Sequence, residues 1–379
     1  MQSTSRRIQK RHGSVTSKWL PVSRRTTDMN TPIISAIDLV TMRKGESPDK
    51  AIARSVELAK AIEKLGYHRF WVPEHHGISF FASASPAVLI GHIAAATRSL
   101  RIGSGGVMLL NHSPMTIAEQ FGTLEAIYPG RIDLGVGRAV GSSSPREEIT
   151  KKALRRDPRI SGDDFPELLA ELQLYLGPAQ KEQEVRAIPG QDSNVPVFLL
   201  SSSGYSAQLA GELGLPFVFA AHISPVNLMS SINLYRQHFR PSKTLERPYV
   251  MVATLALAAE TDQEARRSFT CFQQLALASA RNSSTKVEPP VESMDGLWTA
   301  EEKQAIDRRT QLAIVGGRDT VNRAVQALIE QTRADELLFL SDTYSDEDRL
   351  LSYSILAETM TSLNGQSETG ASSNMANLR

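Results

Sequence analysis

The chain has 379 residues and a formal net charge of +1, with 42 Lys and Arg against 41 Asp and Glu. A charge this close to zero gives no general electrostatic case for binding nucleic acid, an acidic substrate or a membrane surface. The single cysteine, Cys271, excludes an intrachain disulfide and a cysteine-based metal site, and no apolar run approaches the ~20 residues that cross a bilayer. These features predict a soluble, cytoplasmic protein with ample length for a large core.

Both ends of the chain differ in composition from the rest. Residues 1–28 hold seven basic side chains among serines and threonines and no acid before Asp28, which is the composition of an organelle transit peptide. We favour the alternative, a disordered basic extension over residues 1–30, followed by one folded unit at 31–360. The tail, residues 361–379, is rich in Ser, Asn and Gly, so it too is expected to be disordered. An organelle-targeted protein is therefore the alternative to a cytoplasmic one.

Strand-like and helix-like segments alternate from residue 33 onward. Short apolar runs predict strands at residues 33–40, around Trp71, and at 100–110, 132–136, 196–200, 216–221, 249–258 and 336–340. Helical spacing predicts helices at residues 48–65, 87–97, 114–127, 165–176, 205–213, 225–239, 262–280, 319–331 and 347–359. Two polar stretches, 142–163 and 282–310, are expected to shape the substrate pocket, and the loop at 282–295 is long enough to act as a lid.

Eight strands that alternate with helices predict an α/β protein with a closed (β/α)8 barrel of the TIM type, with loop insertions at its carboxyl rim. An open doubly wound sheet is the alternative. It more often carries a glycine-rich turn after its first strand, where this chain has only Gly45. In a barrel, the residues that follow the strands converge on one rim. They are Glu74, His75, Gly105, Gly106, Asn111, Arg138, Ser202, Ser203 and His222.

The segment Glu74-His75-His76 follows the strand around Trp71 and carries titratable groups to this rim. His75, with an ordinary pKa near neutrality, could donate or accept a proton. Glu74 could orient His75 or pair with a basic side chain, and His76 is expected to be structural. We discount a metal site, because adjacent residues of an extended chain point apart and no His-Glu-x-x-His pattern is present.

Two glycines interrupt the third predicted strand. Gly105 and Gly106 weaken a strand unless something flat must approach its backbone closely. A planar cofactor ring is one such object, and a bend at the corner of the barrel is the alternative.

Hydroxyls and one arginine follow the next two strands. Residues 201–206 lie between a strand and a helix, where backbone N–H groups, serine hydroxyls and the helix dipole favour phosphate. Simple N-capping by one serine is the alternative. Arg138 could bind the same phosphate in a bidentate manner, or form an ion pair with Asp133 or Glu125.

Together these segments resemble the bacterial luciferase-like flavin-dependent monooxygenase family. The likeness runs from about Ile33 to Glu358. Its most specific parts are Glu74-His75-His76 and the stretch Pro129-Gly130-Arg131-Ile132-Asp133-Leu134-Gly135-Val136-Gly137-Arg138. The sequence is most similar to the single-chain members found in natural-product clusters, rather than to the light-emitting heterodimer.

The resemblance implies a barrel that binds FMN at its carboxyl rim. Reduced FMN, usually supplied by a separate and transiently bound flavin reductase, reacts with oxygen to give a flavin hydroperoxide that oxygenates a small organic substrate. By position, His75 is the catalytic acid or base with Glu74 beside it, and Gly105-Gly106 is a non-proline cis peptide that supports the flavin ring. The implied phosphate site comprises Arg138, Ser202, Ser203, Gly204, Tyr205 and Ser206. The family also commonly forms homodimers through the second and third helices.

The chain departs from the light-emitting members at two positions. Their reactive cysteine beside the arginine after the fourth strand is Gly137 here, and their aromatic flavin neighbour after the sixth strand is Ala221 or His222. Both changes argue against luminescence and aliphatic aldehydes. Two alternatives stay open: a deazaflavin- or FMN-dependent dehydrogenase or reductase on the same barrel, and a non-catalytic flavin-binding relative.

Overall fold

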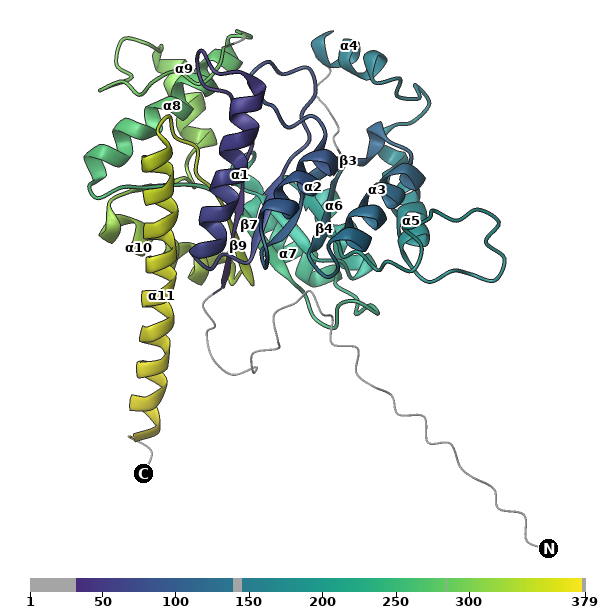
Figure 1. Cartoon of the computed structure of the whole chain (residues 1–379). Helices are drawn as coiled ribbons and strands as arrows, with labels where there is room; N and C mark the ends of the chain where they lie inside the picture. Colours follow the sequence, from purple (N-terminus) through teal and green to yellow (C-terminus); the bar gives the residue numbers. More distant parts are fainter. Residues whose placement is uncertain (1–31, 139–144, 284, 377–379) are drawn as a thin grey trace, which may run out of the picture.

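The computed structural model describes residues 32–138, 145–283 and 285–376 (Figure 1). Eight parallel strands close a barrel in the order β1, β2, β3, β4, β5, β6, β7, β9, and β9 pairs back onto β1. They are β1 (Ile33–Ile37), β2 (Arg69–Val72), β3 (Arg101–Met108), β4 (Ile132–Gly137), β5 (Val197–Ser201), β6 (Phe217–Ala220), β7 (Val250–Ala258) and β9 (Glu336–Leu340). The predicted (β/α)8 barrel is confirmed, with each strand where the sequence predicts it.

Strand register explains why a tryptophan can occupy the inside of this barrel. Trp71 of β2 lies opposite Ile37 of β1 and Gly103 of β3. A Cβ atom at Gly103 would lie 2.7 Å from Trp71 Nε1 and 2.6 Å from the carbonyl oxygen of Asp133, so no larger residue fits there. The Trp71 indole packs edge-on against Phe198 with ring centroids 5.1 Å apart.

Helices follow the strands and cover the outside of the barrel (Figure 1). Proline occupies the first turn of α1 (Pro48–Lys64), α2 (Pro86–Ala96) and α3 (Pro114–Ile127), where its missing N–H has no intrahelical acceptor to lose. The remaining helices are α4 (Pro145–Ala153), α5 (Phe165–Leu176), α6 (Gly204–Leu213), α7 (Leu228–His238), α8 (Asp262–Ala280), α9 (Ala300–Arg309), α10 (Arg318–Thr332) and α11 (Asp346–Ala376). Single 3-10 turns occur at η1 (Leu109–Asn111), η2 (Gly162–Asp164) and η3 (Pro225–Asn227).

The apolar core has two layers that share the strands. Side chains pointing inward, among them Trp71, Phe198 and Met251, fill the barrel. Side chains pointing outward pack against the helices, as Phe70 and Val72 do on β2. Because β2 is buried on both faces, its three residues after Arg69 read as a continuous apolar run.

Three elements lie in stretches that the sequence reading left without regular structure. A short extra strand, β8 (Ile314–Gly316), pairs with β7. The polar stretches 142–163 and 282–310 contain α4 and α9 respectively. The described part of the expected lid loop is joined to the loop after β1, because Val287 and Met42 form a backbone hydrogen bond of 3.0 Å.

The last helix is longer than the sequence predicts. Helix α11 ends at Ala376, well beyond the predicted end at Thr359. Extending an existing helix costs far less than nucleating one, and no proline interrupts this segment. The basic extension at 1–30 lies outside the described residues. Within the described ranges, no helix combines the length and the apolar character needed to cross a membrane.

Candidate active site

The predicted site residues gather at one end of the barrel. Glu74 and His75 follow β2, Arg138 follows β4, and His222 follows β6. Ser202 and Ser203 join β5 to α6, residues 204–206 form the first turn of α6, and Gly105 and Gly106 lie within the second half of β3. Because all eight strands are parallel, their carboxyl ends share this rim.

His75 is held by the loop that leads from β2 to α2. Its backbone N–H donates to the carbonyl oxygen of Ser83 at 2.9 Å, and its Nδ1 lies 3.2 Å from Ser83 Oγ. The ring stacks on Phe81 with centroids 4.2 Å apart. Burial is the main cause that lowers the pKa of His75 to about 4. The charge of Glu74 raises this pKa, and His222 lowers it further. The imidazole is therefore neutral at physiological pH.

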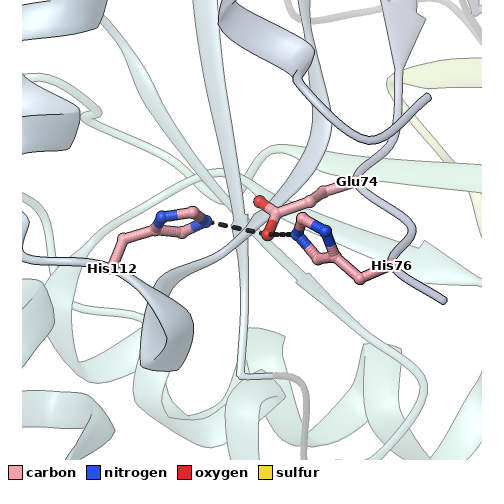
Figure 2. A group of neighbouring side chains, drawn as sticks. All are labelled: Glu74, His76 and His112. Carbon is pink, nitrogen blue, oxygen red and sulfur yellow. Dashed lines mark hydrogen bonds and ion pairs between the residues drawn. The ribbon is translucent and has the colours of Figure 1, made fainter. Parts of the chain in front are cut away.

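The Glu74 carboxylate turns toward His76 and His112 (Figure 2). The ring of His75 instead turns toward Ser83. Oε1 accepts hydrogen bonds from His76 Nε2 at 2.7 Å and from His112 Nε2 at 2.8 Å. Oε2 accepts one from the backbone N–H of Met108 at 3.0 Å. Burial raises the pKa of Glu74, but the bonds from His112 and His76 outweigh it and hold the pKa at about 2. Glu74 is thus a buried, permanently ionised carboxylate.

His112 is the residue of this cluster that the sequence reading missed. It directly follows the turn η1 at the exit of β3, one residue beyond Asn111, which was named as a rim residue. The sequence reading discounted a metal site because adjacent residues of an extended chain point apart. Glu74 and His76, two positions apart, converge, and with His112 they form a group of possible metal ligands. A metal ion at about 2 Å from each ligand keeps the ligand atoms about 3.3 Å apart, so this hydrogen-bonded cluster would have to open to accept one.

The peptide between Gly105 and Gly106 is cis, and the register between β3 and β4 shifts at this point, between Ser104 and Val107. A Cβ atom at Gly106 would lie 2.8 Å from the carbonyl oxygen of Gly135 on β4. At Gly105 it would lie 2.8 Å from Ile37 Cδ1. Both glycines are therefore needed for the close approach of neighbouring strands.

Arg138 and the start of α6 lie together. The Arg138 guanidinium lies over the ring of Tyr205, 4.5 Å from its centroid. Arg138 forms neither of the two ion pairs that were the alternative. The Asp133 carboxylate instead binds Arg69 at 2.8 Å and Arg101 at 3.0 Å. The Glu125 carboxylate accepts a hydrogen bond from the backbone N–H of Gly130.

The serines around the start of α6 differ in their contacts. Ser201 Oγ accepts from the backbone N–H of Ser203 at 3.0 Å, which closes a local turn. Ser203 is the N-cap of α6, and its side chain makes no capping hydrogen bond. Ser206 is buried in the first turn. The simple capping alternative is therefore not what this segment does, and the first-turn N–H groups of α6 face the rim without a side-chain cap.

The insertion between β4 and α5 lies over the Glu74 segment. A Cβ atom at Gly77 would lie 2.7 Å from Thr150 Oγ1 of α4. Between α4, the chain that follows it and η1 there is a cavity of about 350 Å³, lined by Leu110, Lys152, Arg156 and Ile160 among others. This is the stretch that the sequence reading assigned to the substrate pocket.

Cysteine chemistry plays no part at this rim. The single cysteine, Cys271, lies buried in α8, and burial raises the pKa of its thiol to about 12. A thiol with that pKa is protonated and a poor nucleophile at neutral pH.

The sequence profile of the luciferase-like monooxygenase family matches residues 33–336 of this chain. The chain belongs to the luciferase-like monooxygenase family. Its sequence is 46% identical to the YvbT protein of Bacillus subtilis (strain 168) over 327 residues, which cover 86% of this chain and 96% of that protein. It is 42% identical to a luciferase-like monooxygenase of Escherichia coli (strain K12) over 335 residues, which cover 88% and 99%.

Solved structures give the same assignment for the fold. Apo-MsnO8 superposes with a TM-score of 0.80 at 32% identity, covering 88% of this chain and 99% of MsnO8. At 18% identity, the FMN complex of the oxygenating constituent of 3,6-diketocamphane monooxygenase from Pseudomonas putida has a TM-score of 0.63, with 87% and 98% covered. An F420-dependent secondary alcohol dehydrogenase has a TM-score of 0.59 at 14% identity, with 87% and 99% covered. The luciferase-like barrel is thus shared by proteins that bind different flavins.

Proposed function

We propose that this protein is an FMN-dependent monooxygenase that transfers one atom of O2 to a small organic substrate. The observation that carries the proposal is the half-buried imidazole of His75, which is neutral and lies at the barrel rim. A neutral imidazole can give or take a proton beside a reacting oxygen atom.

The rim residues fit each part of FMN. Arg138 and the uncapped start of α6 combine a guanidinium with helix N–H groups, which is a donor set for a phosphate. We assign the phosphate to Arg138, Ser202, Ser203, Gly204, Tyr205 and Ser206. The backbone of Gly105 and Gly106 carries no side chain toward the ring and suits a flat, apolar surface.

When bound, reduced FMN supplies the two electrons that split O2 between the substrate and water. The protein's own part is to hold the reactants and move a proton. Ser83 fixes Nδ1 of His75, which leaves Nε2 as the nitrogen that can exchange a proton at the rim. The Glu74 charge opposes the effect of burial on the pKa of His75 and so keeps this imidazole more basic than burial alone would allow. Helix α4 of the insertion packs against the loop after β2 through Thr150 and Gly77.

Among relatives, a Bacillus subtilis protein of 29% identity over 333 residues is an N-acetyl-S-alkylcysteine monooxygenase. This supports oxygen transfer as the reaction class. We further propose a separate reductase as the transient source of reduced FMN, and a homodimer formed through α2 and α3. Val88 on α2 is 71% exposed and Ile127 on α3 is 58% exposed, so both present apolar surface to a partner. Light scattering in solution measures the oligomeric state, and a monomeric mass would refute the dimer.

The decisive experiment supplies the purified protein with FMN, a flavin reductase, NADH and a substrate panel under 18O2. The expected result is a product one oxygen atom heavier, with the label in the product and O2 uptake that depends on substrate. Hydride transfer without O2 uptake would instead establish a reductase if it runs from reduced F420 to the substrate, or a dehydrogenase if it runs from the substrate to oxidised F420. Tight FMN binding with no turnover of any kind would establish a non-catalytic flavin-binding protein.

A further inference from the structure

One carboxylate connects two consecutive loops of the rim. Glu74 belongs to the loop after β2, whereas Met108 is the last residue of β3 and His112 follows it across η1. Two of the three hydrogen bonds to the Glu74 carboxylate come from this second segment, at 3.0 and 2.8 Å. His112 is itself held by a backbone hydrogen bond to Leu109 at 3.1 Å. The carboxylate therefore ties the exit of β2 to the exit of β3.

Both loops carry a part of the proposed reaction. His75 lies between Glu74 and His76 in sequence, and both of these neighbours belong to the cluster (Figure 2). On the other side, Met108 follows the Gly105-Gly106 peptide by only two residues. A change in the Glu74 contacts would therefore shift the imidazole relative to the surface proposed for the flavin ring.

We propose that His112 is a positioning residue for the proposed monooxygenase reaction: with Glu74 it clamps the exits of β2 and β3 and so fixes His75 relative to Gly105 and Gly106. This inference rests on the proposed function for its kinetic consequences but not for its structural ones. His112 does not touch the reacting atoms and acts through Glu74.

His112 also stabilises the negative charge of Glu74 through its hydrogen bond. Glu74 is 2% exposed, so its ionised form needs strong donors, and His112 is the largest of those that lower its pKa. The groups facing Glu74 are His76 from its own loop, His112 and the Met108 N–H from the β3 exit, and the neighbouring His75. Without the His112 donor, the negative charge of Glu74 is less spread and attracts the imidazolium form of His75 more strongly.

The test compares His112→Ala with His112→Gln, whose side-chain amide can place an N–H where His112 Nε2 lies. The matched control is His238→Ala, a partly exposed histidine at the end of α7, outside the cluster and outside α2 and α3. In the reductase-coupled assay, His112→Ala should lower kcat about tenfold with the FMN dissociation constant changed less than about twofold, and His112→Gln should recover to within about threefold of the wild type. Equal losses in the two His112 variants, or an equal loss in His238→Ala, would overturn the proposal.

A second readout needs no turnover. Histidine NMR follows the titration of His75, assigned by the resonance that His75→Ala lacks. The midpoint of His75 should move to higher pH in His112→Ala and stay near the wild-type value in His112→Gln. An unmoved midpoint in His112→Ala refutes the clamp even where no substrate is oxygenated, so its failure is distinct from failure of the proposed function. Stoichiometric zinc in the purified protein, lost in His112→Ala, would also overturn the proposal, because the cluster would then be a metal site.

Discussion

The two ends of this barrel each bury a carboxylate, but they surround it with different side chains. At the amino end, Asp133 is bound by Arg69 and Arg101 and accepts from Trp71 Nε1 at 3.2 Å. At the carboxyl rim, Glu74 is bound by the imidazoles of His76 and His112. An arginine presents five N–H donors in a rigid fork, whereas each imidazole donates one ring N–H to Glu74.

The surroundings differ in the same direction. The Arg69 and Asp133 side chains are both 0% exposed, and Arg69 also bonds to Glu336 at 3.0 Å. Tyr249 donates to the other oxygen of Glu336 at 2.7 Å. At the rim, the side chains of His76 and His112 are 20% and 28% exposed. The amino end is thus a fixed, closed network for stability, and the rim is a partly exposed network that solvent can reach.

The largest expected effect is at the amino end. Arg69→Met leaves Asp133 and Glu336 buried with fewer donors, so we expect the free energy of unfolding to fall by about 3–5 kcal/mol in urea titrations. The control is Arg247→Met, which removes an exposed ion pair with Asp335 of 3.3 Å and should cost less than about 1 kcal/mol. Similar losses in the two variants would remove the distinction between a closed network and a surface pair.

At the rim, the largest expected effect is on catalysis. His75→Ala should lower kcat by about a hundredfold or more, the scale of a lost general acid or base, and leave FMN affinity nearly unchanged. The measurement is steady-state kinetics beside FMN titration by fluorescence. His238→Ala at the end of α7 again serves as the control. If His75→Ala turns over at the wild-type rate, His75 is not the acid or base.

A smaller effect is expected for cofactor binding. Arg138→Ala removes a charged donor from the proposed phosphate site and should raise the FMN dissociation constant about tenfold, with kcat at saturating FMN little changed. Arg138→Lys keeps the charge without the bidentate geometry, so its FMN dissociation constant should lie between those of the wild type and Arg138→Ala. Unchanged FMN affinity in Arg138→Ala would place the phosphate elsewhere.

The smallest expected effect is on the pH dependence of stability, which should differ between the two ends of the barrel. Burial lowers the pKa of His75 and of His222 from 6.5 to about 4, so each favours folding fully above 6.5 and loses this contribution as pH falls toward 4. Burial raises the pKa of Asp133, but Arg69 and Arg101 outweigh it and hold the pKa at about 2, so the amino end keeps its contribution until pH falls below 3.8. Between pH 6 and 5 we expect the free energy of unfolding of the wild type to fall by roughly 1 kcal/mol per histidine, and that of His222→Gln to fall by less. If the free energy of unfolding of His222→Gln falls equally steeply with pH, His222 is not a source of the pH dependence.

The sequence predicted the barrel well because the barrel depends on repeated local signals. Each strand is a short apolar run, and prolines mark the starts of α1, α2 and α3. Strand β8 escaped because three residues, Ile314–Gly316, are too few to show a period. Helix α11 was predicted too short because composition alone does not say where an established helix stops.

The site was predicted less completely, since contacts between loops leave no local signal. Placing Glu74, His75 and Arg138 at one rim required only the rule that parallel strands end together. The partner of Glu74 required knowing that η1 turns His112 back toward β2, across 38 positions of sequence. The cis peptide at Gly105-Gly106 is present as the family resemblance implied, and the residues alone had allowed a simple bend as well.

The contact between His75 and Ser83 has one more consequence. A serine hydroxyl can rotate to donate to a bare Nδ1 or to accept from a protonated one. The heavy atoms, 3.2 Å apart, need not move for the imidazole to pass from one tautomer to the other. The contact therefore fixes the orientation of the His75 ring but not its tautomer. The same side chain can act as proton donor in one reaction step and as proton acceptor in the next.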